Sequence, residues 1–182
     1  NKATSGSAQW SECEMLGARP DALVRRGISH VSEGKSVIPE LSVKENLVLG
    51  GIWRSNKGDT NAAIAEVVEL FPILGQRMSQ RADTLSGGER QMLAIGRAYM
   101  SRPALLLLDE PMAGLGPTET KEMIALLNKL KGQQTILLIE HDMDAVFALA
   151  DRISVLVSGE IIATGEPDKI RRDSIVQSAY LG

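Results

Sequence analysis

The sequence contains one cysteine, few aromatic residues and no long apolar run. Cys13 alone excludes a disulfide within the chain and a cysteine-based zinc site, and it fits a reducing compartment. Aromatic residues make up 3 %, and Trp10 and Trp53 are too far apart in the sequence to predict a platform that stacks nucleic-acid bases. The longest apolar runs, such as ALLLLD and TILLIE, are too short to span a bilayer. We therefore expect any contact with a membrane to pass through a partner protein.

The sequence also lacks an excess of basic residues. Its 20 Lys and Arg residues against 23 Asp and Glu residues give a net charge of −3. This charge does not indicate nucleic acid as an electrostatic partner. The apolar share of 43 % and the charged share of 24 % are ordinary for a globular protein, and 182 residues suit one domain with a full hydrophobic core.

Buried strands alternate with amphipathic helices in the predicted order of elements. Apolar runs over 104–108 and 135–140 predict strands that are buried on both faces, and shorter strands are predicted over 8–13 and up to Val31. Glycines and a proline predict a loop-rich region over 34–51. Helices are predicted from near Thr60, after Ser86, over 117–132, 142–150 and 167–182, with a hairpin around Ser158-Gly159. This alternation indicates a mainly parallel α/β sheet.

Residues Gly34-Lys35-Ser36 match the end of the phosphate-binding P-loop pattern. That loop requires G-x-x-x-x-G-K-[ST] between a buried strand and a helix, so that backbone N–H groups surround the phosphates. Here Ser29 occupies the first glycine position, and Glu33 would direct a carboxylate at the phosphates. Pro39 obstructs the helix that should follow. We therefore interpret the tripeptide as a chance match.

A stronger pattern is the segment TLSGGERQMLAIGRAYMSRPALLLLDEP. Ser86, Gly87 and Gly88 precede a predicted helix, and the free N–H groups, hydroxyl and positive dipole end of such a helix start can bind an anion. A simple helix cap is the alternative reading of these three residues.

The strand after this helix ends in two adjacent carboxylates, Asp109 and Glu110. Parallel α/β sheets bind their ligands at the carboxyl ends of their strands. The first carboxylate can hold Mg²⁺, directly or through water, and the second can orient or deprotonate an attacking water. A solvated strand end is the alternative. The segment TILLIEHD places His141 just past the next strand, where it faces the same edge.

These segments, in this order, resemble the nucleotide-binding subunit of ATP-binding-cassette (ABC) transporters. LSGGE is similar to the signature motif, LLLLDE to the Walker B strand with its catalytic glutamate, and EHD to the switch histidine. MAGLGP is similar to the D-loop, in which Gly116 replaces the aspartate usual in the wider family. The resemblance covers essentially the whole chain. The segments VSEGKSVIPELSVKENLVLGG, ETKEMIALLNKL and AYLG look most like the branched-chain amino-acid import subfamily.

The resemblance implies two subunits that sandwich ATP head to tail. Residues Leu85 to Glu89, with Ser86, Gly87 and Gly88 at the centre, would cap the γ-phosphate held by the other subunit. Glu110 would act as general base or water positioner, and His141 would sense the γ-phosphate. Asp109 and Glu33 would lie on the Mg²⁺ side. Glu33 takes the place of the family's loop glutamine, which also contacts the membrane subunit, and Lys35 is then an ordinary loop cation.

The implied fold is α/β and P-loop NTPase-like, in a single nucleotide-binding domain over 1–182. A mainly parallel sheet would carry short antiparallel strands and an inserted helical subdomain over about 40–102. Because no P-loop pattern precedes residue 33, we expect the first strand and the P-loop helix to be missing from a chain truncated at its N-terminus. Taken alone, the 182 residues are expected to bind ATP poorly and to hydrolyse it hardly at all.

The resemblance predicts an ATP-hydrolysing subunit, peripheral on the cytoplasmic face of the membrane and docked on an integral permease. It would pair with a second ABC subunit, identical or different, and drive import of amino acids, by likeness branched-chain ones, with urea, amides or other amino acids as alternatives. One alternative function is an ABC ATPase of DNA repair or translation, but the interval from Glu33 to Leu85 is too short for the repair type's coiled-coil insertion, and no nucleic acid is expected. Another is a non-catalytic, shortened cassette that acts as an interaction module.

Overall fold

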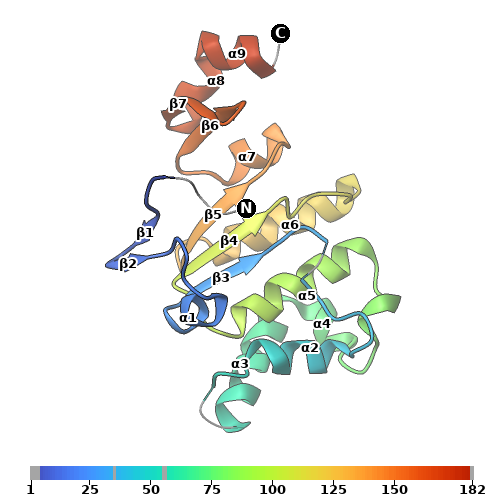
Figure 1. Cartoon of the computed structure of the whole chain (residues 1–182). Helices are drawn as coiled ribbons and strands as arrows, with labels where there is room; N and C mark the ends of the chain where they lie inside the picture. The colour runs from blue at the N-terminus through green and yellow to red at the C-terminus, as the bar shows by residue number, and fades with distance from the viewer. Residues whose placement is uncertain (1–4, 35, 55–56, 181–182) are drawn as a thin grey trace. The chain divides into compact units, whose positions relative to one another are not determined.

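Three parallel strands form the sheet of the N-terminal part of the chain (Figure 1). The computed structural model describes residues 5–34, 36–54 and 57–180, so Lys35, expected to be a loop cation, lies outside the described residues. The strand order is β3-β4-β5, with β3 at Ile28–Val31, β4 at Leu105–Asp109 and β5 at Thr135–Ile139. The α/β class with a mainly parallel sheet is thereby confirmed.

The central strand β4 is buried as predicted, whereas β5 is not. Leu106 and Leu108 of β4 are 0 % and 1 % exposed. In β5, however, Leu137 and Ile139 are 55 % and 57 % exposed, so the prediction of burial on both faces was wrong for this strand. The exposed residues of β5 alternate along the strand, so they share one face, and that face is not covered by another layer within the described residues.

The helices that lie between β3 and β4 in the chain are grouped together on the β3 side of the sheet (Figure 1). They are α2 (Val43–Gly50), α3 (Lys57–Leu70), α4 (Pro72–Gln76), the short 3₁₀ helix η1 (Ala82–Thr84) and α5 (Gly87–Tyr99). Their apolar faces share one core, whose fully buried members include Leu47, Phe71, Leu74, Leu93 and Ile95. This interval covers most of the predicted helical subdomain over 40–102, whose status as a subdomain stays a prediction.

Helix α2 falls in the segment that was predicted to be loop-rich, and that prediction was wrong. Ser42 caps the helix: its hydroxyl accepts the Glu45 N–H at 3.2 Å, and the Glu45 carboxylate accepts the Ser42 N–H at 2.8 Å. Asn46, which is fully buried in α2, accepts the Ile38 N–H at 2.8 Å and donates to the Ile38 carbonyl at 3.0 Å. These bonds fasten the loop that leaves β3 to the helix.

The remaining elements of this part flank the sheet. Residues 8–13 were predicted as one strand but form a small hairpin of β1 (Gln9–Trp10) and β2 (Cys13–Glu14), because Ser11 turns the chain with a φ of 52°. Helix α1 (Pro20–Arg25) leads into β3, and α6 (Pro117–Leu130) connects β4 to β5.

The residues from Glu140 to the C-terminus form a second compact unit with a core of its own. It contains α7 (Met143–Leu149), β6 (Ile153–Val157), β7 (Glu160–Gly165), α8 (Pro167–Arg172) and α9 (Ser174–Tyr180). The hairpin around Ser158-Gly159 is confirmed, and both of its turn residues have a positive φ, as a two-residue hairpin turn requires. The single C-terminal helix that was predicted is divided at Asp173, whose carboxylate accepts the Ile175 N–H at 2.8 Å. Ile153, Val155, Ile170 and Val176 form the core.

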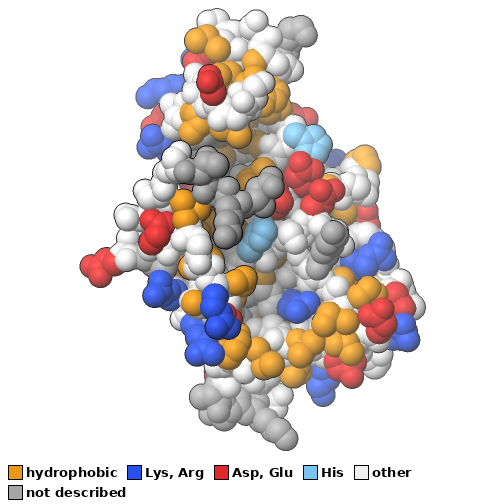
Figure 2. All heavy atoms as spheres, viewed as in Figure 1, with side chains coloured by type: hydrophobic (Ala, Val, Ile, Leu, Met, Phe, Trp, Pro, Cys, Tyr) orange, Lys and Arg blue, Asp and Glu red, His pale blue; other side chains and the backbone are white. Residues whose placement is uncertain are grey.

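Charged side chains of both signs are mixed on the face of the molecule that Figure 2 shows. On the face drawn in Figure 2, Lys and Arg side chains lie in separate small groups among acidic, apolar and uncharged residues. Within the described part of the chain, no helix combines the length and the apolar character that crossing a membrane requires.

Candidate functional site

The carboxyl ends of β3 and β4 bring three of the predicted site residues to one edge of the sheet. Val31 pairs with Leu108 and Asp109 with Ile139, so the neighbouring strands end at nearly the same level. Glu33 lies in an exposed turn after β3. Asp109 ends β4 and Glu110 follows it, and both are half-buried. The sheet therefore gathers Glu33, Asp109 and Glu110 where parallel sheets bind ligands.

Glu110 has a backbone conformation that is unusual for its residue type. Its φ is 48°, in the left-handed region, which costs a non-glycine residue on the order of 1 kcal/mol. The Glu110 N–H donates to the Ile139 carbonyl at 2.9 Å, and the Ala113 N–H donates to the Glu110 carbonyl at 3.0 Å. These bonds hold the strained residue in place at the end of the sheet. Such strain is concentrated at functional positions.

The carboxylates at this edge suit a magnesium ion that is shared with phosphate. Mg²⁺ is usually held by one or two carboxylates together with water and phosphate oxygens, so it needs no cage made of protein alone. Asp109 and Glu33 offer oxygen ligands of this type from neighbouring strands. Within the described residues, no group of three or more His, Cys, Asp or Glu side chains could hold an ion by itself.

The predicted signature residues form the N-terminus of α5. Ser86 is the N-cap: its hydroxyl accepts the Glu89 N–H at 3.1 Å, and its own N–H donates to the Glu89 carboxylate at 2.9 Å. Ser86 and Gly87 are exposed, whereas Gly88 and Leu85 are buried. The Glu89 carboxylate also forms an ion pair with Arg77 at 2.8 Å. Glu89 therefore shapes the helix start, and Ser86 and Gly87 present it to solvent.

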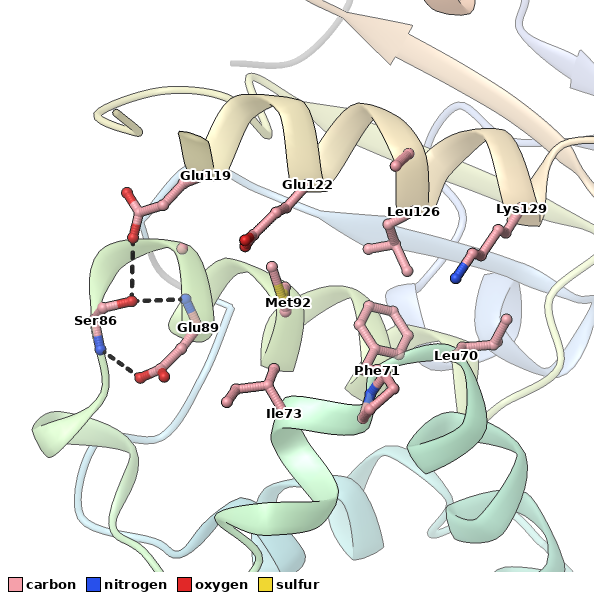
Figure 3. A pocket seen from close by; sticks show the side chains of 13 residues that line it. Leu70, Phe71, Ile73, Ser86, Glu89, Met92, Glu119, Glu122, Leu126 and Lys129 are labelled. Carbon is pink, nitrogen blue, oxygen red and sulfur yellow. Dashed lines mark hydrogen bonds between the residues drawn. The ribbon is translucent and has the colours of Figure 1, made fainter. Parts of the chain in front are cut away.

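A further residue, Glu119 in the first turn of α6, completes this helix start (Figure 3). The Ser86 hydroxyl donates to Glu119 Oε1 at 3.2 Å, and the Gly116 N–H donates to Glu119 Oε2 at 3.2 Å. The Gly116 N–H, and after it the Ser86 hydroxyl and the Gly88 N–H, lower the pKa of Glu119 against an opposing effect of partial desolvation. Glu119 is therefore an anion held by donors from two segments.

Sequence reasoning missed Glu119. Its position in the first turn after Pro117 indicated a helix start, and this local signal gives the hydrogen bond to Gly116. The contact with Ser86 joins residues 33 positions apart, and no local pattern predicts it. The two residues lie at one end of a groove of about 560 Å³ between α5 and α6, whose apolar lining includes Phe71, Ile73, Met92 and Leu126 (Figure 3).

His141 follows β5 in the chain and belongs to the second unit. Its imidazole is exposed, and its Nδ1 lies 3.8 Å from Glu140 Oε2, which accepts the His141 and Asp142 N–H groups. Asp142 then caps α7 by accepting the Ala145 N–H at 3.1 Å. The segment is thus a tightly bonded turn that presents the imidazole to solvent. Its meeting with the carboxylates of the sheet stays a prediction.

Comparisons with known proteins identify the family of this chain. A family model described as ABC transporter matches residues 1–113. Over its full length, the chain is 41 % identical to BraG of Pseudomonas aeruginosa, a high-affinity branched-chain amino acid transport ATP-binding protein, and covers 78 % of it. It is 32 % identical to LivG of Escherichia coli, which is also described as a high-affinity branched-chain amino acid transport ATP-binding protein, and again covers 78 % of it.

A solved ADP conformation of an ATP-binding cassette of an ABC transporter superposes on all of this chain and on 79 % of its own length, with a TM-score of 0.85 and 27 % identity. The chain belongs to the ABC transporter family, whose ATP-binding cassettes have the P-loop NTPase fold and bind nucleotide. The resemblance drawn from the sequence and the α/β, P-loop NTPase-like fold are thereby confirmed.

Proposed function

We propose that this chain is the ATP-hydrolysing subunit of an ABC importer and couples hydrolysis to the uptake of amino acids, branched-chain ones by likeness to its relatives. The observation that carries the proposal is the delivery of Asp109 and Glu110 by a buried central strand to the ligand-binding edge of a parallel sheet. In the same chain, α5 opens with an exposed serine and glycine. Phosphoryl transfer needs groups of these two kinds, for positioning and for charge stabilisation.

Glu110 is the general base or water-positioning residue in this proposal. Its backbone is fixed to β5 through the Ile139 carbonyl, so the carboxylate is carried by the sheet and not by a flexible loop. A carboxylate so held can accept a proton from, or orient, the water that attacks the γ-phosphate. By the resemblance, His141 would contact the γ-phosphate and sense whether it is present.

Asp109 and Glu33 would hold Mg²⁺, which neutralises charge on the phosphates when bound. Leu85 to Glu89 would provide the opposite side of the site. Ser86 and Gly87 are exposed at the positive end of a 13-residue helix, where a phosphate is stabilised by N–H donors, a hydroxyl and the helix dipole.

Two copies, or this chain and a related one, would form two such sites at their interface, because the signature residues of one chain then face the nucleotide of the other. The partner in the membrane would be an integral permease, contacted through the loop of Glu33. By likeness to the family, the subunit would be peripheral on the cytoplasmic face of the membrane. The substrate would be selected by the permease and its binding protein.

An ABC ATPase of DNA repair or translation is the second candidate, and a non-catalytic interaction module is the third. A nucleic-acid machine is disfavoured by the net charge of −3 and by the scattered basic side chains in Figure 2. A non-catalytic module gives no reason for two adjacent carboxylates at the carboxyl end of the buried central strand.

Replacing Glu110 by glutamine tests the proposal in the subunit assembled with its permease. Glutamine preserves size but cannot accept a proton, so ATP turnover should fall by a factor of about 10²–10⁴ while ATP binding remains. Glu122→Gln, an exposed change of the same kind on α6, should leave turnover unchanged. Turnover of Glu110→Gln within twofold of the parent would refute the assignment.

A further inference from the structure

Glu119 occupies the hydrogen-bond donors that a phosphate would use at the start of α5. The Ser86 hydroxyl has one proton, and it is donated to Glu119 Oε1 at 3.2 Å. The Gly88 N–H also acts on the Glu119 carboxylate, and a Cβ atom on Gly88 would lie 2.9 Å from Oε1. The absence of a side chain at Gly88 therefore lets the carboxylate approach this helix start. Figure 3 shows Glu119 directly across from Ser86.

We propose that the Glu119 carboxylate acts as an internal substitute for phosphate at the signature residues and lowers the affinity of this half-site for nucleotide. The proposal rests on the function proposed above. A phosphate that approaches Ser86 meets a hydroxyl proton already donated and a negative charge beside it, and both weaken its binding. ATP-driven association of two subunits must therefore break the Ser86–Glu119 bond.

The contact is built so that it can be broken. It is exposed to solvent, where a hydrogen bond or charge contact contributes little, whereas a γ-phosphate carries more charge and more acceptor oxygens. The two carboxylate oxygens also have separate partners, Ser86 on Oε1 and Gly116 on Oε2. The Ser86 bond can thus be lost while the bond that caps α6 remains.

The contact also connects two functional segments. Gly116 ends the loop that begins after Glu110 and belongs to the D-loop-like segment, and Ser86 begins the signature helix. Displacement of Glu119 by phosphate would therefore change the surroundings of Gly116 as well. This gives the chain a direct physical path from the occupied signature residues to the loop after the catalytic carboxylates.

Titration of ATP against turnover in the subunit assembled with its permease tests the proposal. Glu119→Ala should lower the ATP concentration for half-maximal turnover by about two- to tenfold, the range for removing one competing charge-assisted contact. Maximal turnover should stay within twofold of the parent. Glu122→Gln is the matched control, since Glu122 lies on the same helix, lines the same groove and should leave the half-saturating concentration unchanged.

The direction in which the half-saturating ATP concentration changes distinguishes this role of Glu119 from a purely structural one. Loss of a structural residue weakens the site and raises the half-saturating concentration, whereas loss of a competing carboxylate lowers it. Glu119→Gln keeps an oxygen for the Gly116 N–H and removes the charge. It should lower the half-saturating ATP concentration by less than Glu119→Ala does. This variant also tests the proposal if the alanine variant fails to fold. In a Ser86→Ala background, the decrease caused by Glu119→Ala should become smaller, because only the charge of Glu119 and no longer its bond to the Ser86 hydroxyl then opposes the phosphate.

An unchanged or raised half-saturating concentration in both Glu119 variants, with normal turnover in the parent protein, would overturn this inference alone. A parent protein that does not hydrolyse ATP would overturn it together with the proposed function.

Discussion

Glu45 shows how one exposed carboxylate fixes a helix start in this protein. The Ser42 hydroxyl donates to its carboxylate at 2.6 Å and the Ser42 N–H at 2.8 Å, and the Ser42 hydroxyl first, then its N–H, lower the pKa of Glu45. A capping box also joins Ser86 and Glu89, although the Ser86 hydroxyl donates to Glu119 and not to Glu89. In both places the capping box sets where a helix begins.

The lowered pKa of Glu45 predicts a pH-dependent contribution to stability. A carboxylate with a folded-state pKa below its ordinary value of 4.5 stabilises the fold fully above that pH, and its contribution is lost as the pH falls through the folded-state pKa. Glu45→Gln should therefore have a lower Tm than the parent at pH 7, and the two values should converge below pH 4.5.

Thermal unfolding of both proteins across this pH range checks the prediction. When both proteins also carry Ser42→Ala, the pH-dependent difference in Tm between them should become smaller. This is because the substitution removes the hydroxyl that contributes most to the lowered pKa of Glu45. A Tm difference that is constant across the range would contradict the role assigned to the Glu45 charge.

At the residue scale, sequence reasoning found the groups marked by local patterns and missed those that depend on the fold. Asp109, Glu110 and the Ser-Gly-Gly helix start are adjacent in sequence to a long apolar strand or to a helix, so the pattern locates them. Glu119 contacts Ser86 only because α5 and α6 pack side by side. The exposure of Ile139 likewise depends on the fold, because one face of β5 is left uncovered within the described residues.

At the scale of elements, two glycines set how closely the helices approach one another. A Cβ atom on Gly96 of α5 would lie 3.1 Å from Val67 Cγ1, and one on Gly50 of α2 would lie 2.1 Å from the Arg97 carbonyl oxygen. The atom near Gly50 belongs to the backbone of α5 and cannot rotate away. Gly50 therefore determines the crossing of α2 and α5, and with it the position of the signature helix.

Gly50→Ala should destabilise the protein despite the better helix propensity of alanine. The propensity gain is about 0.5–1 kcal/mol, whereas overpacking against a fixed backbone costs about 1–3 kcal/mol or more, so the clash decides the sign. Denaturant unfolding should show a net loss of stability. Gly87→Ala is the control, since a Cβ there meets no atom within 4 Å. Its free energy of unfolding should stay within about 0.5 kcal/mol of the parent's.

If the Gly50→Ala protein were as stable as the parent, α2 and α5 could move apart without a cost in stability, which would contradict the role assigned to Gly50.

Elements with strong periodicity were predicted well, and short ones were not. Strands β4 and β5 and the hairpin of β6 and β7 follow from apolar runs and a Ser-Gly turn. Helix α2 was overlooked because its flanking glycines and Pro39 suggested a loop, although Ser42 and Glu45 already formed the capping-box pattern. The break between α8 and α9 depends on one side chain, Asp173, that caps the second helix.

At the scale of the whole molecule, the proposed function requires each chain to carry two different halves of a nucleotide site. The carboxylates after β4 and the signature residues before α5 would act on different nucleotides, one bound to each subunit of a dimer. A symmetric dimer then contains two equivalent composite sites. This arrangement predicts that defects in the two half-sites complement each other between chains.

Mixing of two inactive variants in the assembled transporter tests this claim most directly. One subunit carries Glu110→Gln and the other carries Ser86→Arg, and each variant alone should have little ATP turnover. In a mixed dimer, one site contains both parent residues, so random mixing of a symmetric dimer should restore about a quarter of the parent turnover. Turnover in the mixture that stays at the level of the separate variants would contradict a site shared between chains.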